Sequence, residues 1–575
     1  MDVKDLEKIY LSRPFKTRNA DEYDLERILD LFIDPTDGLI GPFDFANVVV
    51  KGKMGSGKTM YLRANYAYHL HTLVPCLIEG NPIVLPVYIR LSDFQHLRDP
   101  KEIYSSILIQ IIKEILSVCR HLQSADELAK LHTGARTLVG TWSTDNELNR
   151  IVQELRKMTS EEYVEKVSHS IEAKGGLVGN FLSMCTALGG KVETESRMRR
   201  NPEFADVVGV CKSLLEPIDG KLLLLFDEIG SISRGFFRGD ENGDSFFETL
   251  MNQLRTLSYA RTKLAIYPNS SSDILKETRY GDVVSLEFNA VSDSKQYRQY
   301  FSKIVSLMER YIDNATGIRC NAEEVFEITT QNQLLVEQLV NASAGNMRRL
   351  VHLLDSSMNE SYKRHGGVDK VTCADVMSAL RKQGADMEAL FQSDDIEFIL
   401  NICKLCKSRS TFRFAYPNKR STLSRFTSQS EEYNIIEIGQ YGTGRKGHSY
   451  YFDYAYCVYK DLPTHYVKGT KTIDRTRSIE SGEPIRRVAQ LSDELLMQSA
   501  LPGKTDGVVG YINPEKDGGF ISAESGESYF FSKDFIIKDD LKKNIYVGCK
   551  VRFLPSEIQA GQKPIVSATE IEILE

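Results

Sequence analysis

Apolar runs alternate with amphipathic stretches along the first half of the chain. The runs lie in "VVVKG", "VLPVYIRLSDF", "KLLLLFDEIG" and "TKLAIYP", which begin at Val48, Val84, Lys221 and Thr262. Helix-like stretches such as "KEIYSSILIQIIKEILSVC" separate them. Strands that are apolar on both sides are buried on both faces, which is typical of parallel sheets covered by helices. The pattern therefore predicts an α/β core of parallel strands over residues 46–289.

The second half of the chain changes its pattern twice. Residues 290–388 have the apolar spacing of helices, and Thr372 stands where it would cap the last of them. Residues 389–466 combine one helix with aromatic, strand-like runs, which predicts a small α+β domain. Residues 506–575 consist of short apolar runs between glycines, which predicts an all-β barrel. Three less regular segments complete the expected organisation: an N-terminal helical arm at 1–45, a helical insertion at about 124–204 and a polar linker at 467–505.

Composition narrows the possible partners. The 575 residues carry a net charge of −7, which excludes a uniformly basic surface, so that any nucleic-acid contact is expected to be a local patch. Ten scattered cysteines and a first stretch without a signal-peptide pattern predict a cytoplasmic protein. The uncharged stretch at residues 175–190 is shorter than the roughly 20 residues of a membrane span, so no membrane contact is expected. Cys403 and Cys406 lie in a helix-like stretch without a second such pair, which favours core packing over a metal site.

The first apolar run leads into a glycine-rich segment, "GKMGSGKT", at residues 52–59. This segment fits the P-loop pattern between a strand and a helix. Glycines allow backbone N–H groups to turn towards phosphates, and the N-terminus of the following helix adds positive potential. Lys58 is expected to reach the β- and γ-phosphates of ATP, and Thr59 to bind Mg²⁺. The expected ATP-binding residues are Gly52, Gly55, Ser56, Gly57, Lys58, Thr59 and Met60.

Acidic residues follow the apolar run that begins at Lys221. Asp227 is expected to complete the Mg²⁺ site, and Glu228 to activate the attacking water as a general base. Asn269 follows the next apolar run, where its amide is expected to position that water. Arg348, in "SAGNMRRL", is expected to contact the γ-phosphate from the helical region. An ordinary surface position stays an open alternative for Asn269 and for Arg348.

The order of these motifs resembles that of the AAA+ ATPases over residues 47–385, and most closely the initiator clade of the origin-recognition type. In that family a sensor-1 Asn and a sensor-2 Arg follow the Asp-Glu strand, and a winged helix follows the helical lid. The resemblance implies a homo-oligomer in which a neighbouring subunit supplies an arginine finger. Arg279 is the candidate finger, and a structural ion pair is the alternative role for it. The insertion at 124–204 departs from minimal initiators, and "RLSDF" after the Val84 strand resembles STAND signalling ATPases.

A basic segment and a glycine-rich hairpin lie within residues 389–466. Seven basic residues and no acid occur from Lys404 to Arg425, and "YGTGRKGHSYYFDY" is typical of a hairpin tip. Ten basic and seven acidic residues give residues 395–466 a net charge of +3. A helix followed by such a hairpin resembles a winged helix, which implies duplex DNA as a partner, while a solvated face of a packing domain is the alternative. The candidate DNA-binding residues are Arg409, Arg413, Lys419, Arg420, Arg425, Arg445 and Lys446.

The C-terminal stretch "GVVGYINPEKDGGFISAESGESYFFS" resembles a cold-shock domain, an OB-type barrel that stacks bases on aromatic side chains. Tyr511, Phe520 and Phe530 match the stacking positions of that family, which implies single-stranded DNA or RNA as a further partner. Gly518 and Ser532 stand where the family usually has an aromatic residue and a histidine. Eight basic and eleven acidic residues give residues 507–575 a net charge of −3, and a barrel used for protein docking is the alternative.

Together, these features predict an ATP-binding and ATP-hydrolysing AAA+ protein that binds nucleic acid under the control of ATP. In this hypothesis the winged helix holds duplex DNA, and the barrel holds single-stranded DNA or RNA. The alternative is a STAND-like or antiviral-defence signalling ATPase that senses nucleic acid or a protein partner, with its effector on another chain. A protein-remodelling motor is less favoured, because the sequence shows no aromatic pore-loop motif.

Overall fold

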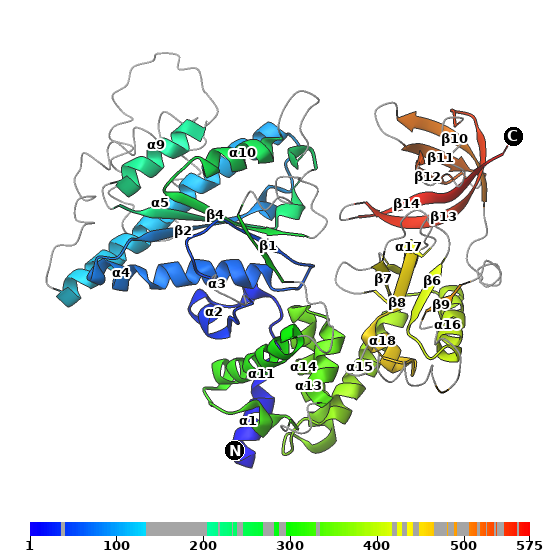
Figure 1. The fold of residues 1–575 in the computed structure, drawn as a ribbon, viewed down its shortest axis with the longest axis horizontal. Helices are drawn as coiled ribbons and strands as arrows, with labels where there is room; N and C mark the ends of the chain where they lie inside the picture. The colour runs from blue at the N-terminus through cyan, green and yellow to red at the C-terminus, as the bar shows by residue number, and fades with distance from the viewer. Residues whose placement is uncertain are drawn as a thin grey trace. The chain divides into compact units, whose positions relative to one another are not determined.

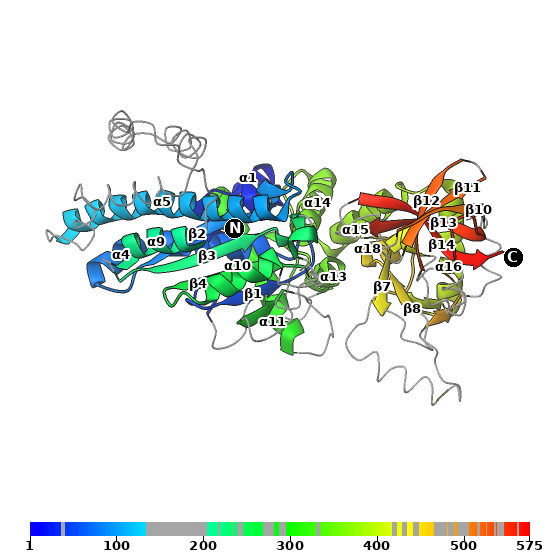
Figure 2. The same ribbon diagram turned by 90° about the horizontal axis from the view of Figure 1, so that it is seen from above.

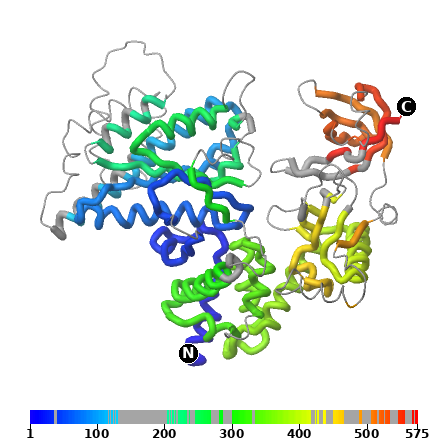
Figure 3. Tube along the Cα trace, in the orientation of Figure 1, coloured from blue at the N-terminus to red at the C-terminus, as the bar shows by residue number. Residues whose placement is uncertain are grey.

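The computed structural model describes the chain except for residues 36–40, 134–203, 217–218, 233, 238–244, 268–280, 287–294, 329–333, 417–422, 428–433, 441–447, 465–479, 481–487, 492–504, 514–517, 525, 534–535, 537–544, 561–562 and 575 (Figure 3). The chain folds into two compact units. The P-loop unit is Thr17–Glu287, and the composite unit joins Met1–Lys16 to Phe288–Glu575. In the described part of the chain, no helix combines the length and the apolar composition that crossing a membrane requires.

A five-stranded parallel sheet forms the centre of the P-loop unit (Figure 1). Its strands are β1 (Val48–Lys51), β2 (Val84–Arg90), β3 (Lys221–Asp227), β4 (Ala260–Ile266) and β5 (Asp282–Ser285). They are arranged in the order β2-β3-β4-β1-β5, and every neighbouring pair runs parallel. The predicted parallel α/β core is therefore confirmed.

Helices cover both faces of this sheet. Alternate residues of the central strands point to opposite faces, and apolar side chains on both faces pack against helices. Leu222 and Leu224 of β3 share an apolar cluster with α5, α9 and α10, whereas Leu223 and Leu225 pack with α2 and α3. Figure 1 shows α3 and α10 on opposite sides of the sheet, and Figure 2 shows the full length of α5. The helices of the unit are α2 (Leu25–Leu31), α3 (Lys58–His71), α4 (Leu73–Glu79), α5 (Pro100–Thr133), α9 (Phe204–Leu215) and α10 (Phe246–Arg255), with the short 3-10 helices η1 (Ala20–Glu22), η2 (Leu91–Phe94), η5 (Ile229–Ser231) and η6 (Arg234–Phe237).

Two details of the sheet differ from the sequence pattern. The apolar run that begins at Val84 is a strand only as far as Arg90, and its last residues turn into η2. No apolar pattern predicts the edge strand β5, because three of its four residues are exposed. This strand joins the sheet through its backbone, for example by the Asp282 N–H that donates to Asn47 O at 3.0 Å. A short, largely exposed edge strand leaves no periodicity that a sequence analysis detects.

Helices form the first part of the composite unit. They are α1 (Val3–Ser12), α11 (Lys295–Thr316), α12 (Ala322–Val325), α13 (Leu334–Ser343), α14 (Met347–His365) and α15 (Cys373–Glu388). Thr372 stands at the N-cap of α15 as predicted, and the Asp375 carboxylate accepts its backbone N–H and its hydroxyl at 2.8 Å each. The predicted all-helical region after the parallel core is therefore confirmed.

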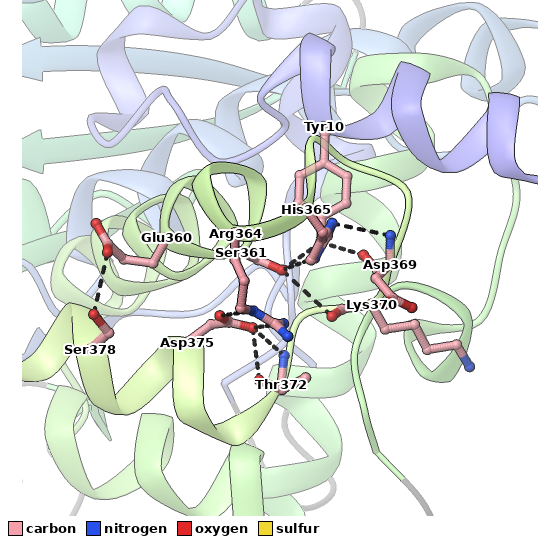
Figure 4. A network of polar contacts seen from close by, with 10 residues as sticks. All are labelled: Tyr10, Glu360, Ser361, Arg364, His365, Asp369, Lys370, Thr372, Asp375 and Ser378. Carbon is pink, nitrogen blue, oxygen red and sulfur yellow. Dashed lines mark hydrogen bonds and ion pairs between the residues drawn. The ribbon is translucent and has the colours of Figure 1, made fainter.

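A polar network joins the N-terminal helix α1 to the connection between α14 and α15 (Figure 4). The Tyr10 hydroxyl donates to Asp369 O at 2.8 Å and lies 3.0 Å from the hydroxyl of the buried Ser361. Arg364 donates to both oxygens of Asp375, at 3.1 and 2.8 Å. Burial raises the pKa of Tyr10 to about 12, so its hydroxyl stays protonated. The N-terminal segment is thus an integral part of the composite unit.

A four-stranded mixed sheet follows, in the order β7-β8-β6-β9. Its elements are α16 (Ser393–Ser408), β6 (Arg413–Tyr416), α17 (Ser424–Thr427), β7 (Ile436–Gln440), β8 (His448–Phe452), α18 (Tyr454–Tyr459) and β9 (Ala489–Gln490). The predicted hairpin is confirmed, because β7 and β8 pair antiparallel. The strand β9 comes from the stretch expected to be a linker, and it pairs with β6 while Ala489 and Leu491 are buried.

The last five strands curl into a small barrel (Figure 3). They are β10 (Thr505–Asn513), β11 (Gly518–Ala523), β12 (Ser528–Ser532), β13 (Lys550–Ala560) and β14 (Lys563–Ile573). Their order is β10-β11-β12-β14-β13, and β13 pairs with β10 to close the barrel. Val509, Ile521 and Phe531 lie in its apolar interior. The predicted all-β fold of the C-terminal region is therefore confirmed.

Candidate nucleotide-binding site

The predicted P-loop connects β1 to α3. Gly55 and Gly57 have φ angles of 75° and 98°, in the left-handed region that residues with a Cβ rarely adopt. Gly57 directly precedes Lys58, the first residue of α3, and has no side chain with which to cap that helix. No side chain caps the start of α3, and the helix dipole there favours an anionic ligand.

Gly52 and Ser56 shape the interior of this loop. A Cβ at position 52 would lie only 2.1 Å from Ser56 Oγ and 3.2 Å from Leu286 Cβ, so a larger residue there would displace the Ser56 side chain. Ser56 is 8% exposed, and its hydroxyl has no hydrogen-bond partner among the residues that the structure describes. A buried hydroxyl without a partner is costly, and a bound phosphate would supply one. The loop therefore fits a phosphate group.

The Lys58 ammonium lies against the loop. Its Nζ donates to the carbonyl oxygens of Gly52 and Lys53 at 2.8 Å each, and lies 4.2 Å from the centroid of the Tyr267 ring. Only 9% of the residue is exposed, so the positive charge is held at the loop. Thr59 follows in the first turn of α3, next to Met60, and both are partly exposed.

Asp227 and Glu228 stand at the carboxyl end of β3, where the sequence places them. Asp227 is 2% exposed, and its carboxylate accepts the Tyr88 hydroxyl at 2.6 Å and the Glu228 N–H at 2.8 Å. Burial and the Asp227 carboxylate raise the pKa of Tyr88 well above its usual value, so Tyr88 remains a donor. Glu228 has φ 55° and ψ 40°, a left-handed conformation that costs a non-glycine residue about 1–3 kcal/mol and is frequent at functional sites.

The order of the strands brings the two motifs to one edge of the sheet. β4 lies between β1 and β3, and the Gly52 N–H donates to the carbonyl of Ile266, the last residue of β4, at 3.3 Å. Tyr267, the next residue, lies beside Lys58, and a Cβ on Gly230 would come within 2.8 Å of the Tyr267 ring. Tyr267 therefore packs between the P-loop and the turn that follows Asp227.

Sequence reasoning did not single out Tyr88 and Tyr267. Both are aromatic residues near the carboxyl end of a strand in the sheet that carries the P-loop. That position is a usable signal, since ligands of open α/β sheets bind outside the carboxyl ends of the strands. Only the order of the strands places these two tyrosines, rather than other aromatic residues, next to the site, and that order is a property of the tertiary structure.

Three further residues were predicted for the ATP site: Asn269, Arg279 and Arg348. Asn269 and Arg279 fall outside the described residues. Arg348 lies in the first turn of α14, in the composite unit, and is partly exposed. Its neighbour Arg349 is buried in an ion pair. The roles expected of Asn269, Arg279 and Arg348 stay predictions.

Few of the predicted DNA-binding residues fall within the described part of the chain. Arg409 follows α16 and Arg413 begins β6, and both are exposed. The side chain of Arg425, on α17, is not described. The remaining candidates fall outside the described residues: Lys419, Arg420, Arg445 and Lys446. Within the same region Cys403 and Cys406 belong to an apolar cluster, which confirms their predicted packing in the core, and burial raises the pKa of each thiol to about 12.

An aromatic row crosses the outer face of the barrel. Tyr511 on β10 pairs in register with Phe520 on β11, which pairs with Phe530 on β12. Tyr511 and Phe520 are 50% and 45% exposed, and Phe530 is partly exposed. The rings of Phe520 and Phe530 are 6.0 Å apart. The structure thus brings all three predicted stacking residues together. Gly518 and Ser532 pair in register on β11 and β12.

The fold and the site together define a class of protein. A parallel sheet with a glycine-rich loop between strand and helix, and an acidic pair at the end of a nearby strand, is the architecture of P-loop nucleotide-binding proteins. Residues 13–95 match the family model described as ORC-CDC6-like. The matched range contains the whole P-loop and β2, and this part of the chain is therefore similar to that family.

The comparison with solved structures yields a distant likeness. The chain is similar to the Aeropyrum pernix ORC2 protein, solved as ADPNP-ADP complexes, with 12% sequence identity and a TM-score of 0.28. The match covers 62% of this chain and 67% of that chain. A likeness of this strength carries neither function nor details of the site. A comparison with curated proteins finds no match.

Proposed function

We propose that the chain is a Mg²⁺-dependent ATPase of the AAA+ type, and that its ATP state controls binding to nucleic acid. One observation carries this proposal: the P-loop and the Asp227–Glu228 pair lie at the carboxyl ends of β1 and β3, on either side of β4. The ORC-CDC6-like match over residues 13–95 supports the type of ATPase.

Each residue of the site has a separate proposed role in ATP hydrolysis. Backbone N–H groups of the P-loop and the start of α3 bind the phosphates, and Lys58 neutralises part of their charge. Thr59 and Asp227 would hold Mg²⁺, which when bound counters the charge that develops on the phosphates. Glu228 accepts the proton of the attacking water as general base. In the proposal, Asn269 orients that water, Arg348 contacts the γ-phosphate and Arg279 reaches the site of a neighbouring subunit in a homo-oligomer.

The composite unit supplies the proposed nucleic-acid contacts. The β7–β8 hairpin pairs with β6 through β8 and shares an apolar cluster with α16, which supports the interpretation as a winged helix with duplex DNA as its partner. Arg409 and Arg413 are exposed there and suit phosphate contacts. The aromatic row of Tyr511, Phe520 and Phe530 supports a cold-shock type of barrel that stacks the bases of single-stranded DNA or RNA.

ATP hydrolysis by the purified protein tests the proposal directly. Turnover is measured alone and with duplex DNA, single-stranded DNA or RNA, each at two salt concentrations. Lys58→Ala is expected to lose nucleotide binding, because it removes the charge at the P-loop. Glu228→Gln is expected to bind ATP normally and to hydrolyse it about 10²–10⁴ times more slowly, which is the usual contribution of a general base.

The outcomes separate the parts of the proposal. Normal turnover in Glu228→Gln would contradict the role of the general base. Stimulation by one nucleic acid that disappears at high salt would support the nucleic-acid partner and identify it. Slow hydrolysis that no nucleic acid changes would contradict that partner and favour a signalling switch that responds to another protein.

A further inference from the structure

We propose that Tyr88 is a positioning residue that holds the Asp227 carboxylate in the orientation needed to bind Mg²⁺. The inference rests on the proposed function, because it assigns a role within the same site. Tyr88 itself touches neither nucleotide nor metal in this proposal. It acts through Asp227.

The hydrogen bonds of Asp227 show how its carboxylate is fixed. Tyr88 Oη donates to Oδ2 at 2.6 Å, a separation typical of a hydroxyl that donates to a charged carboxylate. The Glu228 N–H donates to Oδ1 at 2.8 Å. One donor on each oxygen fixes the plane of the carboxylate. Each oxygen accepts more than one hydrogen bond, so both keep capacity for a metal ion or a water in its shell.

Tyr88 reaches Asp227 because of the register between β2 and β3. Arg90 lies opposite Asp227, and Tyr88 lies opposite Leu225. Tyr88 and Arg90 lie on the same face of the sheet, since they are two residues apart on one strand. The hydroxyl at the end of the long tyrosine side chain spans the distance of two residues along the strand. A phenylalanine at position 88 would fill the same space without this donor.

Tyr88 also packs on the helix that begins at the P-loop. Its ring lies 6.1 Å from that of Tyr66 on α3, at an interplanar angle of 63°. Tyr66 follows Thr59 by seven residues, and this spacing places both on one face of the helix. The contacts from Tyr66 to Tyr88 and from Tyr88 to Asp227 therefore link the elements that carry the two proposed Mg²⁺ ligands.

Binding of a fluorescent ATP analogue tests the inference without measuring turnover. The analogue is titrated into the full-length protein at a series of Mg²⁺ concentrations and in EDTA. Tyr88→Phe is expected to raise the Mg²⁺ concentration for half-maximal binding about 10-fold or more, because the loss of a partner that orients a metal ligand typically costs 10–100-fold in metal affinity. The affinity for the analogue in EDTA is expected to be unchanged, which shows that the P-loop is intact.

Tyr66→Phe is the matched control. It removes a hydroxyl from the adjacent, partly buried ring and leaves the Tyr88–Asp227 hydrogen bond in place. This variant is expected to show the Mg²⁺ dependence of the wild type. Thermal unfolding of both variants sets an assay temperature at which all the proteins are folded.

Two results would overturn the inference. One is a wild-type Mg²⁺ dependence in Tyr88→Phe, even if its thermal stability falls, because that combination indicates a purely structural hydroxyl. The other is an equal shift in both variants, which would attribute the effect to packing of the ring pair. Failure of the wild-type protein to bind the analogue in a Mg²⁺-dependent way would instead contradict the proposed function.

Discussion

Two ionisable residues are buried where α3 packs on the sheet: His69 on α3 itself and Lys263 on β4. Lys263 on β4 is fully buried, and its Nζ donates to Pro42 O and to Asn65 Oδ1 at 2.7 Å each. Burial lowers the pKa of Lys263 to about 7. Burial lowers the pKa of His69 to about 4, and the positive charge of Lys263 contributes to the same shift. The folded state therefore favours a neutral His69.

We expect the stability of the P-loop unit to fall as the pH decreases from about 6.5 to about 4. The unfolded chain, in which histidine has a pKa of about 6.5, binds a proton before the folded state does. The contribution of His69 is therefore complete above pH 6.5 and is lost as the pH falls towards 4. The slope amounts to at most about 1.4 kcal/mol per pH unit for one such group. Urea unfolding at pH 7.5, 5.5 and 4.5 measures it.

Two variants test this assignment to His69. His69→Phe cannot take up the proton and is expected to have a shallower pH dependence than the wild type. His96→Gln, at an exposed position, is the control and is expected to keep the wild-type slope. Identical slopes in His69→Phe and the wild type would show that other groups cause the acid sensitivity.

At the scale of elements, a buried ion pair fastens α18 to α14. Arg349 donates to the two oxygens of Asp453 at 2.6 and 2.8 Å, and the side chains of the pair are only 3% and 2% exposed. The same Asp453 carboxylate caps α18 by accepting the Ala455 N–H at 2.8 Å. On the neighbouring α15, a Cβ on Gly384 would lie 2.7 Å from Ala455 O, so α15 and α18 are in close contact. The mixed-sheet region therefore packs on α14, the helix that carries Arg348, and on α15.

We expect Arg349→Met to destabilise the composite unit by about 3–5 kcal/mol, because it leaves the Asp453 carboxylate buried without its partner. Asp453→Asn keeps the cap of α18 but removes the charge. The double variant Arg349→Met/Asp453→Asn is therefore expected to recover most of the stability. Chemical unfolding of the two single variants and the double variant gives the coupling between the two residues.

A second ion pair in the same unit serves as the control. Arg319 and Asp313 lie 3.5 Å apart, and their side chains are 92% and 42% exposed. Arg319→Met is expected to cost about 1 kcal/mol or less, as is usual for exposed pairs. An equal loss of stability in Arg349→Met and Arg319→Met would contradict the importance of burial.

At the scale of the whole molecule, two surfaces of different chemistry belong to the composite unit. The exposed Arg409 and Arg413 lie at the end of α16 and the start of β6, and an aromatic row lies on the barrel. Removing the charges of Arg413, Lys419 and Arg445 is expected to weaken duplex binding and to reduce its salt slope by about 0.9 for each phosphate that the protein no longer neutralises. Replacing Phe520 by Leu is expected to weaken single-strand binding by about 1–3 kcal/mol, because the variant has one stacking ring fewer.

Fluorescence anisotropy with duplex and single-stranded oligonucleotides, at several salt concentrations, measures both effects. Tyr546→Leu is the control for the barrel, because Tyr546 is 65% exposed but does not belong to the aromatic row. It is expected to leave single-strand binding unchanged. An unaltered salt slope after removal of the three charges would exclude that surface as the duplex-binding one.

Local patterns in the sequence determined the motifs and most of the elements. The P-loop, the pair Asp227–Glu228 and the cap at Thr372 are each encoded within a few residues, and their structures depend on turn conformations and strand or helix ends nearby. The continuous apolar runs likewise predicted a parallel sheet, because a strand that is buried on both faces is apolar at nearly every position. The helical region, the hairpin and the barrel were predictable for similar reasons.

Only the tertiary structure decided which distant segments meet. The position of β4 between β1 and β3 brings Tyr267 to Lys58, and the register of β2 brings Tyr88 to Asp227, 139 residues away in sequence. Contacts between distant segments also form the strands β5 and β9, which pair with β1 and β6. The same is true of the buried ion pair between Arg349 and Asp453. A hydrogen bond or an ion pair between remote residues leaves no periodicity in either segment. Such a contact stabilises the protein only after folding has buried both of its partners next to each other.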